Sequence, residues 1–71
     1  SGAKVSLYAA NGGNNQKWIM VKTDKGYELH NAANNSLVLD AAGVNPVSGA
    51  KVSLYAANGG NNQKWQLIQQ P

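Results

Sequence analysis

The feature that most constrains this chain is an internal duplication. The sequence SGAKVSLYAANGGNNQKW occurs at residues 1–18 (the first copy) and again, letter for letter, at residues 48–65 (the second copy). The two copies begin 47 residues apart, so the chain contains one complete 47-residue unit preceded by the second half of another. A fixed period of this size is typical of repeat proteins, in which one unit cannot bury its apolar face alone.

The identity of the two copies also bears on the origin of the chain. Natural repeats diverge in sequence, and these two copies agree at every position. We therefore interpret the chain as an engineered or reconstructed fragment. A natural gene with a recent internal duplication is the alternative.

Composition excludes several classes of protein. A length of 71 residues allows one small domain. The chain has no Cys and a single His, which excludes disulfides and disfavours a metal site. Its net charge of +3 comes from scattered lysines without any Arg, a poor basis for binding nucleic acid. No apolar run approaches the roughly 20 residues of a membrane span, so we expect a soluble chain, secreted if natural and recombinant if engineered.

Short alternating runs separated by Gly, Asn and Asp predict an all-β chain. Val5 and Leu7 illustrate the alternation, since both lie on one face of their run. Trp18 and Trp65 are expected in the core, beside Met20 and Leu67. The six expected strands are Lys4–Ala9, Gln16–Lys22, Tyr27–Asn31, Ser36–Ala41, Lys51–Ala56 and Gln63–Gln69, with a hairpin loop at 23–26.

Three spaced motifs in register carry a family resemblance. Leu-Asp at 39–40, Gly-Ala-x-Val-x-Leu-Tyr at 49–55 and Gly-x-Asn-Gln-x-Trp at 60–65 resemble one unit of the ricin B-type β-trefoil lectins. These lectins are marked by a Gln-x-Trp repeat, which is Gln63-Lys64-Trp65 here. The resemblance divides the chain into a half repeat at 1–22 and a complete repeat at 26–69.

The resemblance implies a fold that one chain cannot complete. The family fold arranges three units around a pseudo-threefold axis, as a six-stranded barrel capped by three hairpins. We therefore expect a β-trefoil assembled from more than one chain. The combined length of two chains favours a homodimer, and a homotrimer is the alternative. A monomer would leave strand edges and an apolar face open.

The resemblance also implies a sugar-binding site. Asp40 and Asn62 would bond adjacent sugar hydroxyls, Tyr55 would stack on the ring, and Gln63 would hold the Asp carboxylate in place. Ser53 stands where galactose-binding members often carry Gln. The remaining wall of the pocket would come from the loop that follows Asp40, at Val44 and Asn45.

Each of these residues also has a purely structural interpretation. Asp40 can tie down the loop that follows it, and Asn62 fits the turn chemistry of a Gly-Asn cluster. Tyr55 can be a half-buried strand aromatic, and Gln63 a structural residue. The first copy carries Tyr8, Asn15 and Gln16 without an aspartate partner. It could form a second, partial site only if another chain supplied Asp40.

We therefore predict a lectin module for galactose or GalNAc-type glycans that self-associates and uses no cofactor or metal. The alternative is an engineered structural trefoil fragment that retains no ligand binding. Catalysis is not expected, because Asp24 falls in the hairpin turn and Glu28 on an exposed strand face, which sets up no carboxylate pair, and His30 is alone. A trefoil that binds protein or heparin through basic residues is disfavoured by the scattered lysines.

Overall fold

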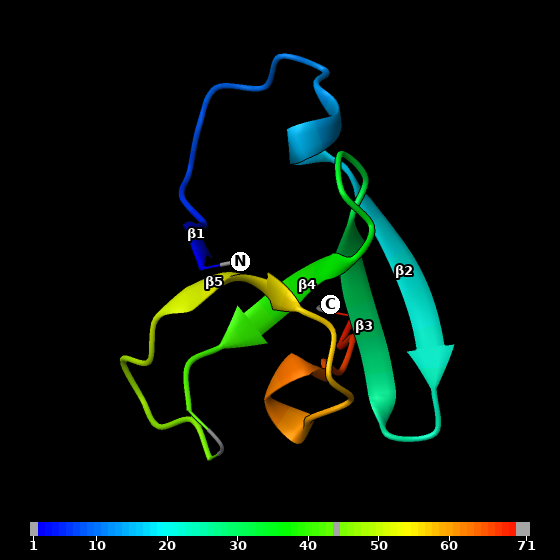
Figure 1. Ribbon diagram of the computed structural model, residues 1–71, viewed down its shortest axis with the longest axis vertical. Coiled ribbons are helices and arrows are strands. Elements are labelled where there is room, and N and C mark those ends of the chain that lie inside the picture. The colour runs from blue at the N-terminus through cyan, green and yellow to red at the C-terminus, as the bar shows by residue number, and fades with distance from the viewer. Residues whose placement is uncertain (1, 44, 70–71) are drawn as a thin grey trace.

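The computed structural model describes residues 2–43 and 45–69. In these residues the chain forms one antiparallel sheet of five strands in the order β1-β5-β4-β3-β2 (Figure 1). The strands are β1 (Ala3–Lys4), β2 (Trp18–Thr23), β3 (Gly26–Asn31), β4 (Leu37–Ala41) and β5 (Val52–Ala56), with single-turn 3-10 helices η1 (Asn14–Gln16) and η2 (Asn61–Gln63). The prediction of an all-β chain is confirmed.

β2 and β3 form the most regular part of the sheet, a hairpin paired over six residues of each strand. Thr23 pairs with Gly26, and the Thr23 hydroxyl donates to the Gly26 carbonyl at 2.6 Å. Gly26 has φ of +128°, and a Cβ there would lie 2.9 Å from the carbonyl oxygen of Trp65. Only glycine allows both this positive φ and the close carbonyl, so Gly26 lets the C-terminal segment approach the hairpin. The predicted hairpin is confirmed by the pairing of β2 with β3.

β4 and β5 form the centre of the sheet and pair at all five positions. Directly paired residues share a face of an antiparallel sheet, and that face alternates along each strand. Val38 and Asp40 are buried on one face of β4, whereas Leu37 and Leu39 on the other face are half-buried. The better-covered face therefore carries a carboxylate as well as an apolar side chain.

Two of the six expected strands are not formed as predicted. Of the run Lys4–Ala9 only Lys4 lies in a strand, as the last residue of β1, and within the described chain residues 5–10 join no strand but loop away from the sheet (Figure 1). The run Gln63–Gln69 begins in η2, and within the part of the chain that the structure describes it pairs through a single bridge from Trp65 to Tyr27. The prediction Gln16–Lys22 also starts too early, because Gln16 belongs to η1.

One physical cause accounts for the loss of the N-terminal strand. The chain has two copies of the strand-forming sequence but only one β4 for them to pair with. The second copy forms β5 and pairs with β4 along its full length. The first copy reaches only the far edge of β5, where Ala3 pairs with Leu54 and Lys4 with Ser53. A strand without a neighbour leaves its backbone groups unpaired and gains little over the coil.

The apolar core of the single chain is small. Among the described residues Val38 is the one fully buried hydrophobic side chain. Trp18 is 37% exposed, so the prediction that it lies in the core is wrong for one chain, because its strand β2 is the edge of a sheet without a second layer. Trp65 is half-buried and its indole N–H donates to the Leu39 carbonyl at 3.1 Å. The exposed large apolar side chains are Val5, Leu7, Tyr8, Trp18, Ile19, Met20, Val21, Val47, Val52, Tyr55, Leu67 and Ile68.

Candidate functional site

The candidate site centres on Asp40, near the end of β4. Its side chain is buried, with 6% of the residue exposed, and Oδ2 accepts two hydrogen bonds from the second copy. Gln63 Nε2 donates to it at 2.9 Å and Asn62 Nδ2 at 3.2 Å. Asn62 Nδ2 also donates to the Ala41 carbonyl at 3.0 Å. A buried carboxylate needs such partners, because an unpaired one costs several kcal/mol.

The second carboxylate oxygen of Asp40 is left available. Within the described residues Oδ1 accepts no hydrogen bond. It is not sealed from solvent either, because no described side-chain N or O atom is both buried and without a partner. The protein therefore fixes one oxygen of the Asp40 carboxylate and makes no hydrogen bond to the other from its described residues.

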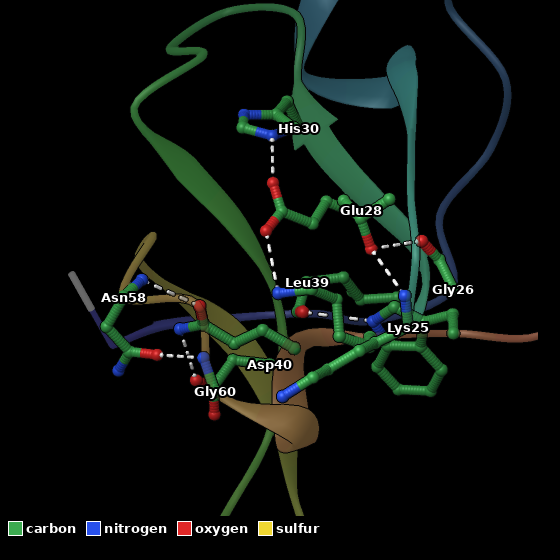
Figure 2. A network of polar contacts seen from close by, with 12 residues as sticks. Lys25, Gly26, Glu28, His30, Leu39, Asp40, Asn58 and Gly60 are labelled. Carbon is green, nitrogen blue, oxygen red and sulfur yellow. Dashed lines mark hydrogen bonds and ion pairs between the residues drawn. The ribbon is translucent and has the colours of Figure 1, made fainter.

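Gln63 fixes the carboxylate by three bonds of its own. The residue is fully buried, with 0% exposed. In addition to its bond to Asp40, Nε2 donates to the Ala56 carbonyl at 3.0 Å and Oε1 accepts from the Asn58 amide at 2.9 Å. Figure 2 shows this segment beside Asp40, with the Asn58 side chain accepting from Gly60 N at 2.8 Å. The glutamine thus ties η2 to the ends of β4 and β5.

Sheet register places Tyr55 and Ser53 on the same face as Asp40. Ser53 pairs directly with Asp40, and Tyr55 pairs with Val38. Tyr55 is therefore a diagonal neighbour of Asp40, at the roughly 7–8 Å that separates such positions. Tyr55 is exposed, at 49% of the residue, whereas Ser53 is half-buried.

A shallow hollow of about 390 Å³ adjoins the Asp40 cluster. Asn45, from the loop after β4, and Asn62, from η2, both line it. Asp40 and Tyr55 are not part of its lining. The hollow therefore includes only the part of the predicted pocket that Asn45 and Asn62 form. Val44, predicted to form the far wall, lies outside the described residues. The full lining is Gly43, Asn45, Asn58, Gly60, Asn61 and Asn62.

The residues predicted for a second site lie apart from this cluster. Gln16 donates to the Ala9 carbonyl and accepts from the backbone N–H of Asn11, both at 2.7 Å, and no carboxylate of a described residue bonds to it. Tyr8 is exposed. Tyr8, Asn15 and Gln16 line a second, larger hollow on the side of the first copy.

An ion-paired cluster was missed by sequence reasoning. Glu28, expected on an exposed face, is half-buried and joins His30 Nε2 at 3.0 Å and Lys64 Nζ at 2.9 Å (Figure 2). His30 Nδ1 lies 2.7 Å from the Asn35 carbonyl oxygen. The period of two along β3, which puts Glu28 and His30 on one face, could have revealed the pair, but nothing local pointed to Lys64.

The cluster shifts the pKa values of Glu28 and His30 in opposite directions. The hydrogen bonds from Lys64 and then from His30 lower the pKa of Glu28 below its ordinary value of 4.5. The bond to the Asn35 carbonyl, followed by the bond to Glu28, raises the pKa of His30 above its ordinary 6.5, although burial acts in the opposite direction. Both ring nitrogens face acceptors, which favours the imidazolium form.

Other kinds of site are not seen in the described part of the chain. No three His, Cys, Asp or Glu side chains gather there as they would around a metal ion. None of the described helices has the length and apolar character needed to cross a membrane.

Comparison with known protein families identifies the family of the chain. A model of the ricin-type beta-trefoil lectin domain-like family matches the chain twice, over residues 1–55 and 14–71. One match contains the whole first copy and the other the whole second copy, and both contain β3 and β4. A search of curated proteins found no match. Since the matched ranges span the chain and the strands are those of an antiparallel all-β fold, the chain belongs to the ricin-type β-trefoil lectin domain-like family.

Proposed function

We propose that the chain binds carbohydrate of the galactose or GalNAc type at Asp40. The observation that carries the proposal is the asymmetry of the Asp40 carboxylate, whose Oδ2 is held by Gln63 and Asn62 while Oδ1 has no donor among residues 2–43 and 45–69. A carboxylate oxygen fixed in this way accepts charge-assisted bonds from sugar hydroxyls. Membership of a lectin domain family supports the same ligand class.

The neighbouring side chains supply the other contacts that a pyranose needs. The exposed ring of Tyr55, diagonal to Asp40, offers an apolar face for stacking. Asn62 and Asn45 present amide groups from the adjoining hollow. Gln63 holds the carboxylate and does not contact the sugar in this proposal. The affinity of one such site is about millimolar, and several sites in an assembly raise it.

Self-association belongs to the same proposal. β2 is an edge strand whose side chains Ile19, Met20 and Val21 are all exposed, and residues 5–10 have no strand neighbour among the described residues. Exposed apolar edges pair with other chains. The assembly we favour is a homodimer with a homotrimer as alternative, and neither requires a cofactor.

Substitution of Asp40 tests the sugar site. In Asp40→Asn the amide oxygen can still accept from Gln63, so the fold is kept, but the ligand-facing atom becomes a donor. Galactose or lactose affinity is expected to fall at least about tenfold in calorimetric titration, from loss of a charge-assisted bond. Asp24→Asn makes the same change at an exposed turn and serves as the matched control.

The outcome separates the lectin from a structural fragment that has lost its ligand, which the duplicated sequence favours as the alternative. Equal affinities in the two variants would contradict the assignment of Asp40. A wild-type chain without any sugar-dependent signal on a glycan array would leave the structural fragment as the better description.

A further inference from the structure

The first copy keeps the local geometry of the second, although no carboxylate of a described residue bonds to its Asn15 or Gln16 side chain. Gln16 Nε2 donates to the Ala9 carbonyl and Gln16 Oε1 accepts from the backbone N–H of Asn11, both at 2.7 Å. The corresponding bonds in the second copy are 3.0 and 2.9 Å. The residues that precede η1 and η2 also share a backbone conformation, with φ and ψ of −71° and 154° against −69° and 155°.

The neighbouring asparagine is held in the same way. A Cβ built on Gly13 would lie 2.6 Å from Asn15 Oδ1, and one built on Gly60 would lie 2.7 Å from Asn62 Oδ1. The two amide oxygens thus take the same place relative to the turn. Since Asn62 uses its Nδ2 to bond Asp40, the Nδ2 of Asn15 is already turned toward the equivalent position.

The equivalent position is a cavity. Asp40, from β4, is contacted by three residues of the second copy: its register partner Ser53 and the hydrogen-bond donors Asn62 and Gln63. The counterparts of these three residues are Ser6, Asn15 and Gln16, and all three line one hollow of about 540 Å³. The hollow therefore lies where a carboxylate would complete the first copy.

The Asn15 and Gln16 side chains each keep at least one N–H that bonds to no described residue. Within the described residues Gln16 Nε2 donates only to the Ala9 carbonyl, whereas Gln63 Nε2 donates to a carbonyl and to Asp40. The Asn15 side chain donates to no described group, whereas Asn62 donates twice. Preorganised donors of this kind lose little on binding, because their conformation is fixed in advance.

Another molecule of the same protein is a poor source of the missing carboxylate. Each chain has a single Asp40, and its own second copy already holds it. Any assembly therefore contains twice as many amide pairs as Asp40 side chains. One amide pair per chain is therefore left without an Asp40 partner, whatever the number of chains.

We propose that the hollow lined by Ser6, Asn15 and Gln16 binds the carboxylate of an acidic sugar, with the two amide groups donating to it as their counterparts donate to Asp40. Lys4 lines the same hollow and adds a positive charge, in a chain of net charge +3. Tyr8 and Trp18 line it too, and their rings give the sugar a surface to stack on. This site is separate from the one proposed at Asp40 and takes a charged ligand in place of a neutral one.

Site-resolved titration of the intact chain tests the proposal. The side-chain amide resonances of Asn15 and Gln16 are followed by NMR while D-galacturonate, galactose or acetate is added. Galacturonate is expected to shift both amides with saturation, and galactose and acetate at equal concentration are not. Gln16→Glu replaces a donor with a like charge and is expected to weaken galacturonate binding at least about tenfold.

Gln66→Glu makes the same change at an exposed position outside both hollows and is expected to keep the wild-type affinity within about twofold. Equal responses to galacturonate and galactose, or to galacturonate and acetate, would overturn the proposal. So would amide shifts that follow protein concentration alone and resist galacturonate, since a second chain would then fill the hollow. Binding at Asp40 is read from Asn62 and Gln63, so failure at one site is distinguishable from failure at the other.

Discussion

Gln63 and Gln16 occupy the same place in identical sequences and differ only in their surroundings. Both bond the carbonyl seven residues earlier and the amide five residues earlier. Gln63 is fully buried and adds the bond to Asp40, whereas Gln16 is half-buried and lacks it. The pair therefore isolates the contribution of the carboxylate and of burial from that of local structure.

Truncating the two glutamines should have unequal effects. Gln63→Ala removes three hydrogen bonds and leaves the buried Asp40 carboxylate with one partner, so the free energy of unfolding is expected to fall by about 2–4 kcal/mol. Gln16→Ala is expected to cost less than about 1 kcal/mol, because water reaches the groups that it leaves. Urea denaturation of both variants measures the difference. Equal losses would show that the Asp40 contact adds no stability.

At the scale of elements, the cluster on β3 joins three segments of the chain. Glu28 and His30 lie on β3, Lys64 follows η2, and Asn35 precedes β4. The bridge between Tyr27 and Trp65 brings the Lys64 segment to the hairpin, with backbone bonds of 2.7 and 2.8 Å. Opposite charges held by backbone pairing act as a clamp between the β2–β3 hairpin and the second copy.

The clamp gives stability a pH window. The raised pKa of His30 means that its contribution is full below 6.5 and is lost as pH rises through the folded-state pKa. The lowered pKa of Glu28 means that its contribution is full above 4.5 and is lost as pH falls through its folded-state pKa. The cluster is therefore most stabilising between 4.5 and 6.5. In wild type the free energy of unfolding should decline as pH rises above 6.5.

His30→Gln should remove that decline, because His30 is the only histidine in the chain. Denaturant unfolding at a series of pH values measures the slope in both proteins. The same slope in the variant would mean that another group is responsible for it.

At the scale of the whole molecule, the chain has more apolar surface than it can cover. Leu7 is fully exposed and the edge strand β2 shows apolar side chains on both faces. Small domains are marginally stable even with a complete core, and this one buries a single hydrophobic side chain fully among its described residues. Association would cover this surface and pair the open edge of β2.

A lysine on the open edge should weaken association. Ile19 is 48% exposed, so Ile19→Lys costs the single chain little, yet it places a charge where a second strand would pair. Sedimentation equilibrium is expected to show a concentration-dependent mass for wild type and a mass close to 7.5 kDa for the variant. Val47→Lys, at an exposed loop position, is the control and should associate as wild type. A wild-type chain that stays at 7.5 kDa at all concentrations would contradict the assembly.

The sequence alone was enough for the all-β class, the 23–26 hairpin and the family. These follow from local signals: alternation along strands, Gly and Asn at turns, and motifs whose spacing survives in the linear chain. The association of Asp40 with Asn62 and Gln63 was predicted from the resemblance, and the bonds of 3.2 and 2.9 Å place the three together. Their role in binding a sugar stays a prediction.

Tertiary structure alone decided what the duplicated sequence becomes. Residues 52–56 form β5, whereas the identical residues 5–9 form no strand, because the chain has one β4 and the second copy pairs with it. The same competition leaves Trp18 exposed while Trp65 bonds Leu39, and buries Gln63 while Gln16 faces a hollow. Identical local preferences cannot distinguish the two copies. The difference arises from strand pairing, which depends on a neighbour that only one copy can have.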